Sequence, residues 1–254
     1  MTTPGTLWLV PAPLDLGAPE APLQAVLPQA VLHRAAALQH WVVEDAKSAR
    51  ALLKRVGQIV PLSQPLQALQ LVELPRPPKG TPRGGAPAID WGALLAPALQ
   101  GHDLGLLSEA GLPAVADPGS ALVAAAHAAG VPVQPLSGPS SLMLALAASG
   151  LNGQSFAFVG YLPQDAAART VRIRELEAWS RLQAQTQLAI ETPYRNAALL
   201  QALLQALQPT TRLSVSVGLT LEGGYTRSAP VSAWRRDPGA LPDRLPAVFA
   251  WLAG

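Results

Sequence analysis

Two glycine-containing loops carry the residue types best suited to holding a small ligand. The first is Ser108-Glu109-Ala110-Gly111 and the second is Ser137-Gly138-Pro139-Ser140-Ser141. Glycine lets backbone N–H groups approach a bound molecule closely, and a helix N-terminus favours a carboxylate or a phosphate. We therefore expect the two loops to form one wall of a binding pocket. The same residue types also make ordinary strand-to-helix turns, so the spacing alone leaves both interpretations open.

The segments around these loops read as a parallel strand–helix–strand unit followed by one more helix. The expected strands are 104–107 and 131–136, and the expected helices run from 117 to Gly130 and from 137 to Gly150. Asp117 is expected to cap the first helix, with Pro118 at its first position. Both loops then lie at the carboxyl ends of the strands, where open α/β sheets bind ligands.

The remaining chain continues the alternation of strands and helices. Further strands are expected at 6–10, 40–43, 69–74, 156–162, 187–191, 213–219 and 247–252, and helices at 29–38, 46–56, 89–99, 168–183 and 195–207. The segment 221–231 is typical of an antiparallel piece turning at Gly223-Gly224. The pattern breaks at 151–155, so we expect an α/β protein with two domains, 1–150 and 151–254.

Composition excludes several classes of protein. Apolar residues make up 49% of the 254 residues and charged residues 13%, which excludes a disordered chain. No apolar run approaches the roughly 20 residues of a membrane span. The N-terminus does not resemble a signal peptide, so a cytoplasmic protein is expected. With a net charge of +2, RNA binding is neither favoured nor excluded.

Known catalytic motifs are mostly missing from the sequence. The chain has no cysteine, which excludes disulfides, thiolate nucleophiles and zinc sites built on sulfur. The four histidines show no metal-like spacing with carboxylates, so no metal is expected. The nucleophile elbow, the Walker loop and the dinucleotide fingerprint are all absent from the sequence. What remains is a ligand held by glycine loops in apolar surroundings.

Other polar residues have two interpretations each. Glu44 and Asp45 follow the strand 40–43 and either act in the site or cap the next helix, with capping favoured. The loop 75–87 carries Arg76, Lys79 and Arg83, as a lid over an anionic substrate would, although a solvated linker is the commoner structure.

A set of short motifs occurs in a fixed order along most of the chain. They are Ser108-Glu109-Ala110-Gly111-Leu112-Pro113, Asp117-Pro118-Gly119, Ser137-Gly138-Pro139-Ser140, Gly160-Tyr161-Leu162-Pro163 and Glu191-Thr192-Pro193-Tyr194-Arg195. In this order they resemble the tetrapyrrole methylase superfamily, specifically the branch that contains ribosomal RNA small subunit methyltransferase I. Together the motifs are far more specific than any one of them.

The resemblance implies two α/β domains with S-adenosylmethionine in the cleft between them, and a homodimer. It also implies methyl transfer to RNA, at the ribose 2′-oxygen of a cytidine. The cofactor-binding residues that it implies are Pro11, Ser108, Glu109, Ala110, Gly111, Asp117, Gly138, Pro139, Ser140, Ser141, Thr192, Pro193 and Tyr194.

The sequence departs from this branch where RNA would be held. The A-E-D-T-R motif becomes Val43-Glu44-Asp45-Ala46-Lys47, and R-E-L-T-K becomes Val217-Gly218-Leu219-Thr220-Leu221, without its charged ends. Methylation of a small molecule such as a tetrapyrrole therefore stays open, as does a non-catalytic protein that binds S-adenosylmethionine. A hydroxyl acceptor needs a base. The carboxylates near the expected pocket are Asp15, Glu44, Asp45 and Glu109, and the sequence does not choose among them.

Overall fold

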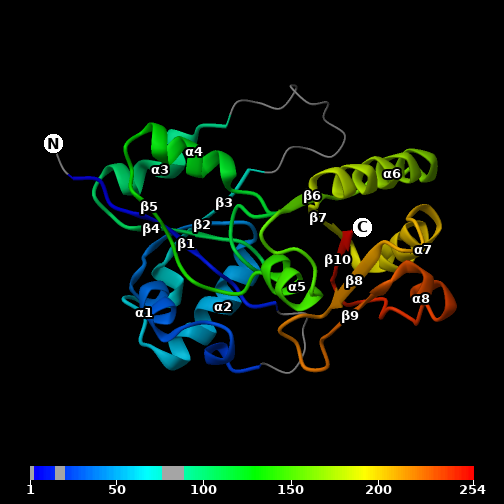
Figure 1. Cartoon of the computed structure of the whole chain (residues 1–254). Helices are drawn as coiled ribbons and strands as arrows, with labels where there is room; N and C mark the ends of the chain where they lie inside the picture. Colours follow the sequence, from blue (N-terminus) through cyan, green and yellow to red (C-terminus); the bar gives the residue numbers. More distant parts are fainter. Residues whose placement is uncertain (1–2, 15–20, 76–88) are drawn as a thin grey trace. The chain divides into compact units, whose positions relative to one another are not determined.

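The computed structural model describes residues 3–14, 21–75 and 89–254 of the chain (Figure 1). By its internal contacts the chain divides into two compact units, Met1–Pro139 and Ser140–Gly254. Each unit contains one five-stranded sheet with helices packed on it. The expected fold class, two α/β domains, is therefore confirmed.

The sheet of the first unit is parallel throughout. Its strands are β1 (Leu7–Val10), β2 (His40–Val43), β3 (Gln70–Glu73), β4 (Leu104–Leu107) and β5 (Val133–Pro135). They lie in the order β3-β2-β4-β1-β5. Val10 and Val43 both lie opposite Leu107, so the strands β1, β4 and β2 end at the same level. The loops that follow them therefore emerge together at one edge of the sheet.

Helices cover both faces of this sheet. Successive residues of a strand point to opposite sides, and here the apolar side chains on both sides pack against helices. The helices α1 (Gln29–Ala37) and α2 (Ala46–Ile59) pack with Leu107 on one face. The helices α3 (Trp91–Leu99) and α4 (Ser120–Ala128) pack with Leu106 on the other face. Figure 1 shows α1 and α2 on one side of this sheet and α3 and α4 on the other. Two short 3-10 helices, η1 (Leu23–Ala25) and η2 (Leu66–Ala68), complete the described part of this unit.

The sheet of the second unit is mixed. Its strands are β6 (Phe156–Gly160), β7 (Thr186–Glu191), β8 (Arg212–Val217), β9 (Tyr225–Pro230) and β10 (Ala247–Leu252), in the order β6-β7-β10-β8-β9. Only β6 and β7 run parallel, and the other pairs are antiparallel. The helices α6 (Ala166–Gln183), α7 (Asn196–Ala206) and α8 (Val231–Arg236) contribute to the core on one face.

The helix α5 (Ser141–Ser149) packs on the other face of the second sheet. Its Leu142 and Leu146 contact the cluster that contains Leu188 of β7 and Val248 of β10. The division between the units therefore lies before α5, between Pro139 and Ser140, and not after Gly150 as the sequence suggested. Gly150 ends the helix in the left-handed conformation, as expected.

The expected start of α4 is wrong. Asp117 does not cap this helix: the cap position is Gly119, at φ +127°, and the first helical residue is Ser120. Ala114 and Ala116 also have positive φ, so the segment before Gly119 is irregular and does not extend the helix backwards. Within the described ranges, no helix is long and apolar enough to cross a membrane.

Candidate functional site

The strands β1 and β4 are neighbours, and the segments that follow them lead to opposite faces of the sheet. After β1 the chain leads to α1, and after β4 it leads to α4, which covers the opposite face of the sheet. Such a point, where the connections diverge, opens a crevice at the carboxyl edge of a parallel sheet. It is here that the first unit is best arranged to bind a ligand.

The loops after β1 and β4 are joined by their backbones. The N–H of Ala12 donates to the carbonyl of Gly111 at 2.9 Å, and the N–H of Gly111 donates to the carbonyl of Ala12 at 2.8 Å. Gly111 has φ +76°, a backbone conformation that residues other than glycine rarely adopt. The glycine of the first loop is thus needed for the turn that reaches back to β1.

The loop after β5 packs against the loop after β1. A Cβ added to Gly138 would lie 2.3 Å from the Cβ and Cγ atoms of Pro11, so only glycine fits there. A Cβ added to Gly111 would lie 3.9 Å from the carbonyl oxygen of Pro139. The structure therefore brings Pro11, Gly111, Gly138 and Pro139 together, which the sequence predicted only as a shared edge.

Ser108 supplies a polar group that no neighbour satisfies. It follows β4 directly and is 4% exposed, and its Oγ has no hydrogen-bond partner in the described part of the chain. Leaving a buried hydroxyl unpaired costs about 1–3 kcal/mol. Such a group fits a site that is completed by a bound molecule. Ala110, two residues later, is half-buried.

Three carboxylates gather beside this loop, and we call Glu44, Glu109 and Asp117 the acidic group. The backbone N–H of Glu109 donates to Oε2 of Glu44 at 3.2 Å. Partial burial, together with the smaller effect of the negative charges of Glu44 and Glu109, raises the pKa of Asp117 to about 6. The acidic group therefore favours a neutral Asp117 or a nearby positive charge.

Of the neighbouring residues Glu44 and Asp45, one caps a helix and the other lies at the candidate site. Asp45 caps α2, where its carboxylate accepts from the N–H of Ser48 at 2.7 Å. Glu44 instead reaches the loop after β4. The sequence did not group Glu44 with Asp117, because that grouping depends on β2 lying next to β4. Asp15 and the loop residues Arg76, Lys79 and Arg83 lie outside the described residues.

The other expected cofactor residues belong to the second unit. Ser140 precedes α5 without making a side-chain cap, and Ser141 is the first residue of that helix. Thr192 leads into the 3-10 helix η3 (Pro193–Arg195), in which Tyr194 is 75% exposed. The 192–194 segment thus presents its tyrosine to solvent.

Glu191 fixes this segment. Its Oε1 accepts from the N–H of Thr192 at 2.7 Å and from Nη2 of Arg195 at 2.6 Å. The carboxylate is nearly buried, at 4% side-chain exposure, so the ion pair is well shielded from water. Neither Glu191 nor Arg195 was expected among the site residues, although both belong to the motif that marked this loop.

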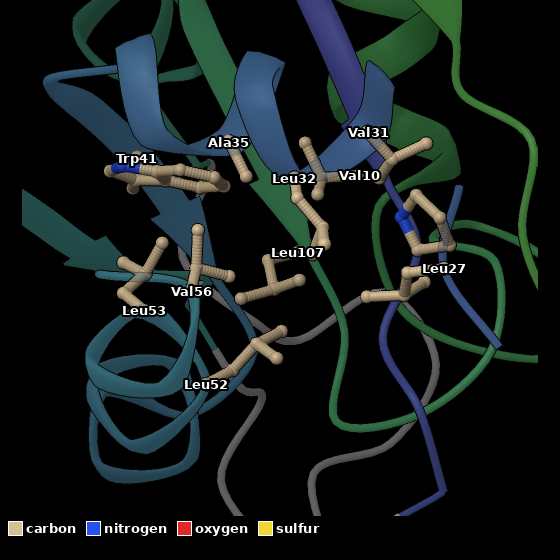
Figure 2. Close-up of a pocket in the computed structure, with 11 residues that line it drawn as sticks. Val10, Leu27, Val31, Leu32, Ala35, Trp41, Leu52, Leu53, Val56 and Leu107 are labelled. Carbon is tan, nitrogen blue, oxygen red and sulfur yellow. The ribbon is translucent and has the colours of Figure 1, made fainter. Parts of the chain in front are cut away.

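Two hollows elsewhere do not suit the expected ligand. Figure 2 shows an apolar cavity of about 10 Å³ between α1, α2 and the first sheet, lined by residues such as Leu32, Trp41 and Leu107. It is large enough for at most one water and offers no polar partner. An open hollow of about 610 Å³ in the second unit includes Glu177, whose carboxylate already accepts from the Gln208 N–H and the Thr211 hydroxyl.

The described side chains also limit the chemistry of the site. Across the described ranges, no three His, Asp or Glu residues are grouped so as to hold a metal ion. The loops after β1, β2, β4 and β5 offer backbone groups, the unpaired Ser108 hydroxyl and the acidic group. This arrangement can hold and orient a small polar molecule.

Comparisons with known proteins agree with this architecture. A sequence profile of the Tetrapyrrole (Corrin/Porphyrin) Methylases matches residues 42–232. Ribosomal RNA small subunit methyltransferase I of Xylella fastidiosa is 35% identical over 179 residues, which are 69% of this chain and 56% of that protein. Its counterpart in Vibrio cholerae is 41% identical over 109 residues, 43% of this chain and 36% of that protein. The chain thus spans about half the length, or less, of these curated relatives.

Solved structures show the same fold at lower identity. Uroporphyrin-III-C-methyltransferase from Thermus thermophilus matches with a TM-score of 0.50 and 19% identity, over 98% of this chain and 94% of that one. The conserved hypothetical protein APE0931 from Aeropyrum pernix K1 matches with a TM-score of 0.59 and 20% identity, over 98% of this chain and 85% of that one.

Proposed function

Because this chain belongs to the tetrapyrrole (corrin/porphyrin) methylase family, we propose that it is a methyltransferase that uses S-adenosylmethionine. The observation that carries the proposal is the meeting of three loops at the divergence of β1 and β4. There Gly111 and Gly138 let the loops after β1, β4 and β5 approach one another closely, and the Ser108 hydroxyl has no hydrogen-bond partner in the described part of the chain.

The proposed cofactor residues of the first unit are those that these loops carry. They are Pro11, Ser108, Glu109, Ala110, Gly111, Asp117, Gly138 and Pro139. The family resemblance adds Ser140, Ser141, Thr192, Pro193 and Tyr194 from the second unit. The Ser108 hydroxyl, which is unpaired within the described ranges, fits a small polar cofactor.

S-adenosylmethionine, when bound, supplies a methyl group on a positively charged sulfur. The chain's part in the reaction is then to hold the donor in line with its acceptor, which is where positioning contributes most of the rate. The backbone bridge between Ala12 and Gly111 holds the loops after β1 and β4 together. The ion pair of Glu191 and Arg195 holds Thr192 in the same way.

For the acceptor we propose ribosomal RNA of the small subunit, at a ribose 2′-oxygen of a cytidine. The support is the name shared by the relatives, which are 35% and 41% identical to this chain over the matched segments. A small molecule is the second candidate, because the segment Val217 to Leu221 lacks the charged ends of the motif in the RNA enzymes. A cytoplasmic location would suit either acceptor.

One experiment separates the two acceptors. Small ribosomal subunits purified from a strain that lacks this protein are incubated with the full chain and radiolabelled S-adenosylmethionine, and subunits from the parent strain serve as the control. Label in the 16S RNA of the deficient subunits alone supports the RNA proposal. No label above background contradicts it, and transfer to a tetrapyrrole in a parallel reaction would establish the alternative.

We also propose that the protein is a homodimer. The strand β6 lies at the edge of its sheet, and its Phe156 and Phe158 are 39% and 37% exposed. Residues two apart on a strand share a face, so these rings form one apolar patch beside an open strand edge. A second copy of the chain is the partner that would cover it.

A further inference from the structure

We propose that the exposed side of α2 binds the phosphate backbone of the substrate RNA through Lys47, Arg50 and Lys54, which we call the basic stripe. The inference rests on the proposed function and goes beyond it by assigning a surface that holds the RNA. The stripe belongs to the first unit and begins beside the candidate site. The helix α2 starts two residues after Glu44, whose carboxylate reaches the loop after β4.

The helix α2 concentrates positive charge. Its 14 residues include four of the chain's 18 lysines and arginines, where the average over 254 residues would place about one. It contains no aspartate and no glutamate. The fourth cation, Arg55, donates to the carbonyl oxygen of Ala21 at 2.7 Å and is not part of the stripe. The small net charge of the whole chain, +2, therefore hides a strongly positive helix.

The basic stripe lies on the side of α2 away from the core. The buried residues of the helix are Ala49, Leu52, Leu53 and Val56. Lys47, Arg50 and Lys54 are all exposed, and they follow one another at spacings of three and four residues. At 3.6 residues per turn these spacings put the three side chains on one side of the helix, over about 10 Å of its axis.

The three charges are not neutralised within the protein. No ion pair joins the stripe to a carboxylate in the described part of the chain. Arg50 Nη1 lies 3.5 Å from the carbonyl oxygen of Ala46, one turn back in the same helix. The carboxylates at the start of α2 bond to its backbone instead: Asp45 accepts from the N–H of Ser48 at 2.7 Å, and Glu73 accepts from the N–H of Ala46 at 2.8 Å.

The stability of α2 does not explain this arrangement of charges. Lys47 lies in the first turn, where the helix dipole disfavours a cation. Arg50 and Lys54 are four residues apart, and like charges at this spacing repel each other on a helix. An anionic partner relieves both effects, so the charges fit binding better than they fit folding.

A phosphate backbone is the partner that the stripe fits best. A membrane surface or the core of a protein interface is contacted by large apolar side chains. In α2 these side chains are buried, except for Ile59 in the last turn, which is 38% exposed. The exposed residues beside the charges are Ala51 and Gln58. Phosphate binding requires only positive charge at the surface, and the proposed RNA acceptor supplies a row of phosphates.

The test is the binding of a fluorescently labelled, single-stranded oligoribonucleotide to the full chain, measured by anisotropy at several salt concentrations. We expect Lys47→Gln, Arg50→Gln and Lys54→Gln each to weaken binding about fivefold at about 0.1 M salt, and each to reduce the slope of log affinity against log salt by about 0.7. The triple variant should bind about a hundredfold more weakly, with a slope reduced by about two.

The matched control is Arg236→Gln, which removes one exposed arginine from α8 in the second unit and should leave affinity and slope unchanged. Calorimetric titration with S-adenosylmethionine should give the same affinity for the triple variant as for the wild type, because α2 carries none of the proposed cofactor residues. The triple variant should also melt no lower than the wild type, since the repulsion within the helix is removed.

Two outcomes would overturn the inference while leaving the proposed function standing. One is a triple variant that binds the RNA as the wild type does, and the other is an equal loss of affinity in Arg236→Gln. Anionic lipid vesicles or polyglutamate that bind through the stripe, when the RNA does not, would also overturn it. If the wild type neither binds nor methylates RNA, the proposed acceptor is wrong and the inference fails with it, whereas titration with S-adenosylmethionine tests the cofactor separately.

Discussion

Asp117 lies partly buried beside two other carboxylates, and its ionisation therefore depends on the fold. Its pKa of about 6 in the folded chain is above the ordinary value near 3.8, so the folded state holds the proton more tightly than the unfolded state does. Stability must then fall as the pH rises from about 3.8 to about 6, because the unfolded chain binds fewer protons over that range. Above pH 6 the full cost is present.

We therefore expect Asp117→Asn to melt about 2–4 °C higher than the wild type at pH 8. At pH 4 the difference should nearly vanish, because the wild-type carboxyl is then protonated in the folded state. Thermal unfolding at several pH values between 4 and 8 measures this, with Asp243→Asn, at an exposed position of the second unit, as a control for loss of charge elsewhere. A difference in melting temperature that is the same at every pH would contradict the raised pKa of Asp117.

Gly138 is constrained by space and not by backbone angle. A methyl group there would meet the ring of Pro11, whose position is fixed by the strand before it. Gly138→Ala should cost about 1–3 kcal/mol in the free energy of unfolding. It should also weaken the binding of S-adenosylmethionine, because both loops are proposed to contact it.

Denaturant titration and calorimetry measure the two effects of Gly138→Ala. Gly153→Ala is the matched control, since nothing lies within 4 Å of a Cβ at that position and it should change neither quantity. If Gly138→Ala folds and binds as the wild type does, the close approach of the loops after β1 and β5 is not important for the site.

At the scale of elements, the helix α1 carries the packing beneath the site. Its Leu32 is fully buried and lines the small cavity next to Trp41 and Leu107, as Figure 2 shows. Leu32→Ala would enlarge a cavity that already exists, and we expect it to cost about 2–5 kcal/mol in the free energy of unfolding. Denaturant unfolding checks this. Leu182→Ala on α6, where the side chain is 72% exposed, should change stability by less than about 0.5 kcal/mol.

Most elements of the parallel sheet follow from the sequence, because its strands are short apolar runs that stop at polar or turn residues. The strands at 40–43 and 104–107 have the expected bounds. The start of α4 was not predictable from Asp117 and Pro118, since Gly119 at φ +127° begins the helix later. The helix α8 was also not expected.

The sequence predicted which loops form the candidate site, but not which of their residues lie next to one another. The positions of Gly111 and Gly138 were marked by residue type, and their meeting at Pro11 needed the strand order. The assignment of α5 failed for a related reason. This helix is apolar on most sides, so its sequence does not say which of two sheets it packs against.

At the scale of the whole molecule, the proposed dimer gives the fourth prediction. Phe158→Asp places a charge in the apolar patch on β6, and we expect it to shift the protein from twice the mass of the chain to the mass of one chain. Light scattering after gel filtration measures this. Leu182→Asp, exposed on α6, should not change the mass, and a wild-type protein that elutes as a monomer would contradict the proposal.

The position of β1 in the first sheet has a consequence for how the protein is made. Of the five strands of this sheet β1 is synthesised first, yet its neighbours are β4 and β5, which come more than ninety residues later. Until residue 107 has been synthesised, neither neighbouring strand of β1 is complete, and its apolar side chains stay exposed. A fragment that stops before β4 would lack the centre of its own sheet. Pairing of β1 therefore depends on contacts between residues far apart in the sequence, which slow the folding of this unit.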